Sequence, residues 1–118
     1  MTQPHAHQLL EIARQTLLEQ VLPALPGELR YPTLMIANAM AIAARENRLG
    51  AVLGLQEQAH LAALIDAPAP SLQEARRQLA RAIRQGHHDT PHSARTLVET
   101  LRQVTLDRLT ISNPKAVR

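Results

Sequence analysis

The stretch that most constrains the fold is residues 34–50, with the sequence LMIANAMAIAARENRLG. Between Leu34 and Ala44 only Asn38 is polar. A helix with this sequence is apolar on all sides, which predicts that other elements cover it on several sides. The stretch from Leu34 to Ala44 rises only about 16 Å as a helix, which is too short to cross a bilayer. We therefore expect a buried central helix over about residues 32–49, with the other helices packed around it.

The composition predicts an all-α protein. Hydrophobic residues make up 45% of the 118 residues, yet Tyr31 is the only aromatic residue. The β-branched and aromatic residues that favour sheets are scarce, so Leu and Ala must supply most of the core. The length fits one domain, residues 1–118. The expected architecture is a compact bundle of five helices.

Proline, glycine and capping residues mark the ends of these helices. Thr2 can cap the first helix, with Pro4 in its first turn, and Pro23 ends it. The proline-punctuated connection 22–32 leads into the central helix. Gly50 is the expected end of the central helix, and residues 51–66 are expected to form a third helix. A fourth helix is expected from Ser71 to Gly86, opened by the capping box SLQE. The last helix is expected to run from Asp89 or Thr90 to Asn113.

The charge pattern argues against nucleic acids and membranes as partners. The net charge is only +3, and the high pI reflects arginines combined with no cysteine, a single tyrosine and a single lysine rather than a large excess of charge. Arg77, Arg81 and Arg84, with Arg76 nearby, form a basic stripe without the interleaved aromatic residues that stack on bases. The first residues show no basic segment followed by an apolar run, so we expect a cytoplasmic protein.

A polar column on the central helix is the most informative candidate site. Tyr31, Asn38 and Arg45 recur every seven residues and therefore share one face. Asp107 on the last helix is a candidate partner for Arg45, as is a backbone carbonyl of that helix. The column either forms the floor of a ligand pocket, with Arg45 orienting a carboxylate or phosphate, or it is a sealed network that fixes the register of the helices.

The third helix is predicted to take part in an interface because it is apolar on two faces. One face carries Val52, Leu55, Ala59 and Ala62, and the other carries Leu53, Leu61 and Leu64. If the first face packs on the central helix, the second needs another cover. We therefore predict that Leu53, Leu61 and Leu64 contact a partner protein or a second copy of this chain.

No motif for catalysis, a cofactor or a metal is found in the sequence. There is no Cys, no nucleophile elbow, no phosphate-binding glycine loop and no pair of catalytic carboxylates. His87, His88 and His92, with Asp89, have the residue types of a metal site, but their spacing in a loop fixes no coordination geometry. We expect these histidines to be solvated and dispensable, and we predict neither a catalytic centre nor a metal.

Several segments together resemble a family of small uncharacterised bacterial helical domains. They are LPGELRY, the helix ending in ARENRLG, the RQG before the histidine loop, and LRQVTLDRLTISNP. The resemblance implies an all-helical fold without an established activity. It also implies genes beside, or fused to, aminoglycoside-phosphotransferase-like kinases and acyl-CoA dehydrogenases. The predicted function is a non-catalytic interaction or accessory domain for such an enzyme. The alternative is a bundle that binds an anionic ligand through Arg45 and Asn38.

Overall fold

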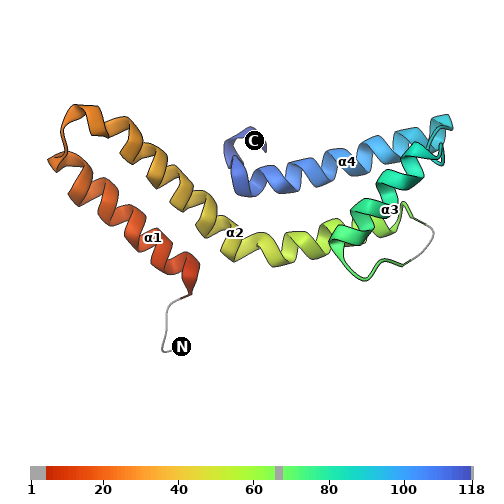
Figure 1. The fold of residues 1–118 in the computed structure, drawn as a ribbon, viewed down its shortest axis with the longest axis horizontal. Coiled ribbons are helices and arrows are strands. Elements are labelled where there is room, and N and C mark those ends of the chain that lie inside the picture. The colour runs from red at the N-terminus through yellow and green to blue at the C-terminus, as the bar shows by residue number, and fades with distance from the viewer. Residues whose placement is uncertain (1–4, 66–67, 118) are drawn as a thin grey trace. The chain divides into compact units, whose positions relative to one another are not determined.

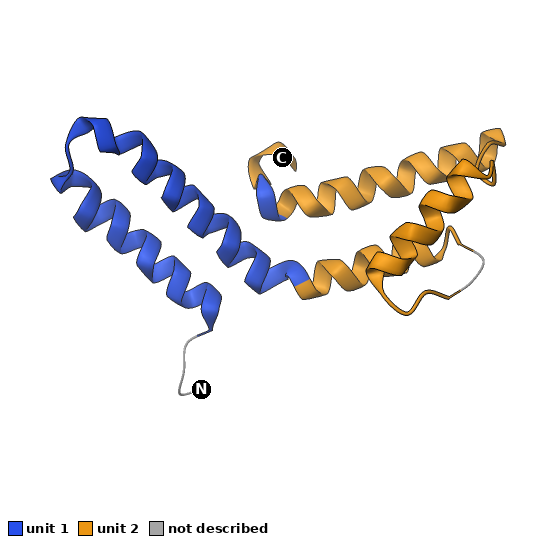
Figure 2. Ribbon diagram, in the orientation of Figure 1, with its two compact units in different colours: residues 1–50, 111–113 blue, residues 51–110, 114–118 orange. Residues whose placement is uncertain are grey.

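The computed structural model describes residues 5–65 and 68–117 and confirms the all-α prediction (Figure 1). Over this part of the chain there are four α-helices and no strand. The predicted cap Thr2 and the first-turn Pro4 lie outside the described residues. The chain divides into two compact units, residues 1–50 with 111–113, and residues 51–110 with 114–118 (Figure 2). The single domain expected from the length stays a prediction.

The first unit is built on an antiparallel helix pair. Helix α1 (Ala6–Thr16) continues through a π-helical turn (Leu17–Val21) and two 3-10 turns (Leu22–Ala24 and Gly27–Leu29) into helix α2 (Arg30–Ala62). Hydrogen bonds of His7 and Arg14 hold α1 against the first half of α2. The His7 backbone N–H donates to Asn47 Oδ1 at 3.0 Å, and Arg14 Nε donates to the Ala37 carbonyl at 3.1 Å.

The expectation that residues 32–49 are buried all round is wrong for this unit. Thr33, Ala37 and Ala44 are buried, but Met35 is 51% exposed and Ile36 is 52% exposed. The reason is geometric: α1 is the one long helix that lies beside this half of α2 within the unit, and a single neighbour covers one side of a helix.

The second unit contains the second half of α2, helix α3 (Leu72–Arg84), helix α4 (Pro91–Ser112) and a final 3-10 turn (Pro114–Val117). Its core consists of Leu61 from α2, Ala75 and Leu79 from α3, and Val104 from α4. Leu64, Ile65, Ala69, Leu72 and Leu97 pack against this cluster. The core is small and aliphatic, as the composition predicts.

The predicted ends of α3 and the start of α4 agree with the structure. Ser71 Oγ accepts the Glu74 backbone N–H at 3.1 Å, which caps α3. Gly86, with a φ of +82°, closes α3 while the His87 N–H returns to the Ala82 carbonyl at 3.0 Å. Thr90 is the cap of α4, because its Oγ1 accepts the Ser93 N–H at 3.3 Å.

The predicted helix break at Gly50 is wrong. Helix α2 runs through both Gly50 and Gly54, so the predicted second and third helices are one helix of 33 residues. Gly86 is the only glycine with positive φ in the part of the chain that the structure describes. A glycine inside a helix costs about 1 kcal/mol relative to alanine, and the good helix formers around Gly50 offset that cost.

We predict that Gly50→Ala raises the free energy of unfolding by about 0.5–1 kcal/mol, because it removes backbone entropy inside a helix. An added Cβ would approach Glu46 Oε1 at 2.6 Å, but this is the free end of a flexible side chain that can rotate away. The control is Gly86→Ala, which should lower stability by about 1 kcal/mol or more because its backbone is left-handed. Urea unfolding of both variants measures this, and a loss in both would identify Gly50 as a helix end.

Candidate functional site

The most highly organised side-chain cluster in the second unit is a buried carboxylate between two arginines. Glu57 on α2 is 5% exposed. Arg76 from α3 donates through Nε to Glu57 Oε2 at 2.6 Å and through Nη2 to Oε1 at 3.1 Å. Arg108 from α4 donates through Nε to Oε1 at 3.1 Å and through Nη2 to Oε2 at 2.8 Å. The cluster of Glu57, Arg76 and Arg108, called the Glu57 triad below, therefore links three helices.

The electrostatics of the triad keep Glu57 ionised. Burial raises the pKa of Glu57, but hydrogen bonds from Arg76 and Arg108, together with their charges, outweigh burial and lower the pKa from 4.5 to about 2. The hydrogen bond to Glu57 in turn raises the pKa of Arg76. A carboxylate accepts about four hydrogen bonds, and Glu57 accepts four. It therefore has no free acceptor with which to act as a general base.

The sequence contains a signal for this cluster that our interpretation missed. Glu57 lies four residues after Leu53 and four before Leu61, so it is an acid in the middle of an apolar stripe. A charge at such a position must be paired, because an unpaired buried charge is strongly destabilising. The sequence does not show which arginines pair with it, since they follow Glu57 by 19 and 51 residues.

A pocket of about 330 Å³ lies beside the triad in the second unit. Its apolar wall includes Leu61, Leu79 and Val104, which also form the core of this unit. The two arginines that border it are already engaged by Glu57. The arrangement joins three helices and supplies no free nucleophile or base, so we assign the triad a structural role.

The predicted polar column is only partly retained. Tyr31 is 71% exposed and Asn38 is also exposed, so the expected floor of buried polar groups is not formed. Arg45 is half-buried, and its Nε donates to the Ile111 carbonyl at 2.6 Å, a backbone partner on the last helix. Asp107 belongs to the second unit, where its Oδ1 accepts from Gln103 Nε2 at 2.9 Å.

Arg45 does line a pocket, but the other lining residues are not the ones predicted. The pocket, of about 260 Å³, lies in the first unit. Neither Tyr31 nor Asn38 is among its lining residues, which are Glu11, Arg14, Met40, Ala41, Ala44, Arg45 and Arg48. Three arginines and one carboxylate thus surround one small pocket. This grouping is not visible in the sequence, because Arg14 lies on α1 and Arg45 and Arg48 lie on α2.

The predicted interface residues Leu53, Leu61 and Leu64 need a correction. Leu61 is 2% exposed and sits at the centre of the core of its own chain, where Leu64 packs against it. Leu53 is partly buried. The opposite face is the exposed one, with Val52 56% exposed and Leu55 70% exposed. The two faces were assigned the wrong way round, because α3 and α4 cover the Leu61 side and the expected break at Gly50 does not exist.

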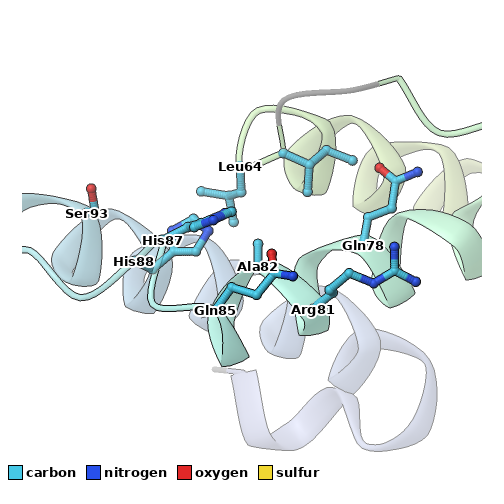
Figure 3. A pocket seen from close by; sticks show the side chains of 9 residues that line it. Leu64, Gln78, Arg81, Ala82, Gln85, His87, His88 and Ser93 are labelled. Carbon is cyan, nitrogen blue, oxygen red and sulfur yellow. The ribbon is translucent and has the colours of Figure 1, made fainter.

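The histidine loop contributes to a third pocket, of about 300 Å³, in the second unit (Figure 3). His87 and His88 line it together with Arg81 of α3, whereas His92 does not. His88 is half-buried, and its Nε2 is buried without a hydrogen-bond partner in the described part of the chain. The expectation that all three histidines are solvated is therefore wrong for His88. Within residues 5–65 and 68–117 no group of three or more His, Cys, Asp or Glu is arranged to hold a metal.

The predicted basic stripe is divided among three different roles. Arg76 pairs with Glu57, and Arg77 Nη1 donates to Glu74 Oε2 at 3.1 Å on the exposed side of α3. Arg81 lines the pocket of the histidine loop. Two of these charges are therefore neutralised locally by an acid.

Residues 23–116 match the family described as Domain of unknown function (DUF6285). The chain belongs to this family. The matched residues include the whole Glu57 triad, whereas α1 with Arg14 precedes them. No curated protein matches the chain, and no solved structure does. Among the described residues of this family member, no helix has the length and apolar character needed to cross a bilayer.

We predict that Glu57→Gln lowers stability in a manner that depends on pH. Because the folded pKa is about 2 and the usual value is 4.5, the triad stabilises the fold fully above about pH 5 and loses this effect as the pH falls toward 2. The shift corresponds to about 2–3 kcal/mol once the partial exposure of both arginines is allowed for.

Urea unfolding at pH 7 and at pH 3 measures this difference. The variant should lose most stability at pH 7 and differ less from the unmodified chain at pH 3. The matched control is Glu74→Gln, whose exposed pair with Arg77 should contribute less than about 0.5 kcal/mol at either pH. Equal effects of both substitutions would contradict the structural role of the triad.

We also predict that Leu61 and Leu55 differ sharply in their contribution to folding. Leu61→Ala should cost about 2–5 kcal/mol because it leaves a cavity in the core of the second unit. Leu55→Ala should change stability by about 0.5 kcal/mol or less, because the side chain is exposed. Thermal unfolding of the two variants compares them directly. The opposite ranking would restore the face assignment made from the sequence.

Proposed function

We propose that this protein is a non-catalytic helical interaction domain that works with a larger enzyme. The observation that carries the proposal is an excess of exposed apolar side chains. Within residues 5–65 and 68–117, six hydrophobic residues are buried, and fourteen large hydrophobic residues are exposed. Single exposed leucines are common on protein surfaces, but grouped ones are typical of a surface that a partner covers.

The best-defined of these groups lies on the second half of α2. Val52, Leu55 and Ala59 are spaced i, i+3, i+7 and are all exposed, so they form one stripe, called the Leu55 stripe below. Residues at this spacing are the usual anchors when an amphipathic helix binds in a groove of another protein. The same helix already presents Glu57 and Leu61 to α3 and α4, so the stripe remains available to a partner.

The partner that we propose is an enzyme encoded beside this protein. The resemblance to small helical domains that accompany aminoglycoside-phosphotransferase-like kinases or acyl-CoA dehydrogenases supports these two classes. The chemistry of the described residues supports an accessory rather than a catalytic role. Glu57 is the one charged residue that is buried among them, and its carboxylate is fully occupied by two arginines.

The test is co-expression of the full chain with each of the two enzymes, followed by mass measurement of the purified complex. Leu55→Glu should weaken the complex by at least about tenfold, because it places an unpaired charge in an apolar contact. The matched control is Gln56→Glu, which adds the same charge at the neighbouring exposed position and should have little effect.

Two other outcomes would contradict this proposal. If the chain alone has a mass above 13.0 kDa that Leu55→Glu reduces, the stripe binds a second copy of the chain instead. If the chain stays a monomer in the presence of each enzyme, or if Leu55→Glu leaves the affinity of the complex unchanged, the Leu55 stripe is not the interface.

Binding of a small anionic ligand is the second candidate function, and the pocket around Arg45 favours it. Asn38, which the sequence suggested as a second ligand-binding residue, does not line that pocket. A ligand there would contact arginines of α1 and α2 rather than the polar column.

A further inference from the structure

The first unit holds three arginines around one small pocket, and two of them are fixed in place by backbone carbonyls. Arg14 Nε donates to the Ala37 carbonyl at 3.1 Å, and Arg45 Nε donates to the Ile111 carbonyl at 2.6 Å. Arg48 lies one turn after Arg45 on the same helix and lines the same pocket. We propose that this pocket, called the arginine pocket below, binds a small oxyanion through the guanidinium groups of Arg14, Arg45 and Arg48.

The hydrogen bonds of the two fixed arginines leave their amino groups available. A guanidinium has five N–H donors, and a bond through Nε engages only one of them. Within the described part of the chain, neither Arg14 nor Arg45 pairs with a carboxylate. Each guanidinium is thus held in orientation without being neutralised. A prearranged fork of this kind loses little further freedom when it binds a carboxylate or a phosphate.

The charges around the pocket also indicate an anionic ligand. Arg45 and Arg48 are three residues apart on α2, and like charges at this spacing destabilise a helix. Glu11 is the single acid among the lining residues, so the lining carries a net charge of +2. An oxyanion with two negative charges would match this excess. The Glu57 triad differs, because there a buried carboxylate already satisfies two arginines.

The size of the pocket limits the ligand to a small molecule. Its volume of about 260 Å³ is below the about 300–1,000 Å³ that is usual for sites of drug-sized ligands. Met40, Ala41 and Ala44 provide the apolar part of its lining. The site therefore suits a phosphate or a small dicarboxylate. This proposal rests on the second candidate function, the binding of a small anionic ligand, and names its site and ligand class. It does not depend on the interaction function, since small probes test it without any partner protein.

The experiment titrates the purified full chain with inorganic phosphate and with malonate, at constant ionic strength set with chloride, and measures the heat of binding. We expect saturable binding of one probe, and which probe binds tells a phosphate site from a carboxylate site. Arg48→Gln should weaken binding by at least about tenfold, because it removes a charge-assisted hydrogen bond. Glu11→Gln should strengthen binding, because it removes the one lining carboxylate.

The matched control is Arg102→Gln, an exposed arginine of α4 that is not among the lining residues and carries the same change of charge. It should leave the affinity unchanged. Arg48 and Glu11 are both exposed, so neither substitution should prevent folding, and an unchanged melting temperature verifies this. If neither phosphate nor malonate binds saturably at millimolar concentration, the proposal is overturned. An equal loss in Arg48→Gln and Arg102→Gln would also overturn it, because it would indicate diffuse attraction by the net charge.

Discussion

The second unit depends on the pairing of Glu57 with two arginines. This carboxylate lies in the apolar stripe by which α2 contacts its neighbours, and α3 and α4 each supply one bidentate partner. The core of Leu61, Ala75, Leu79 and Val104 is small and aliphatic, and apolar packing of this kind is not directional. The triad supplies the directional contacts that such a core lacks, since removing Glu57 takes away the carboxylate that Arg76 and Arg108 share, and removing either arginine takes away two of the four hydrogen bonds to Glu57.

Helix α2 is the element that both units share, and each unit buries its own set of positions on it. The first unit buries Thr33, Ala37 and Ala44, and the second buries Glu57 and Leu61. Between them the helix passes through Gly50 with ordinary helical backbone. The strongly apolar stretch 34–44 therefore does not mark a buried centre. Much of it is exposed in the first unit, where Met35 and Ile36 are each about half exposed.

Five arginines with defined partners fall into two groups with different consequences. Arg76 and Arg108 pair with Glu57 and link three helices, whereas Arg77 pairs with Glu74 on the exposed surface of α3. Arg14 and Arg45 donate to backbone carbonyls, so these bonds do not neutralise their charges, and both side chains line one pocket. The apolar stripe on α2 and the arginine pocket lie in different units, so a protein partner and a small anion would be bound by separate parts of the chain.

The sequence by itself determined the all-α class, the capped ends of α3 and the start of α4, because these follow from local signals: composition, Ser71, Gly86 and Thr90. It could not decide whether Gly50 ends a helix, since glycine is compatible with a left-handed cap and with a helix interior. The tertiary structure alone decided which apolar face of α2 is buried. It also decided which arginines pair with Glu57 and which arginines line the arginine pocket. Those contacts join residues 19 to 66 positions apart, and helical periodicity gives the face of a residue but not the helix that packs against it.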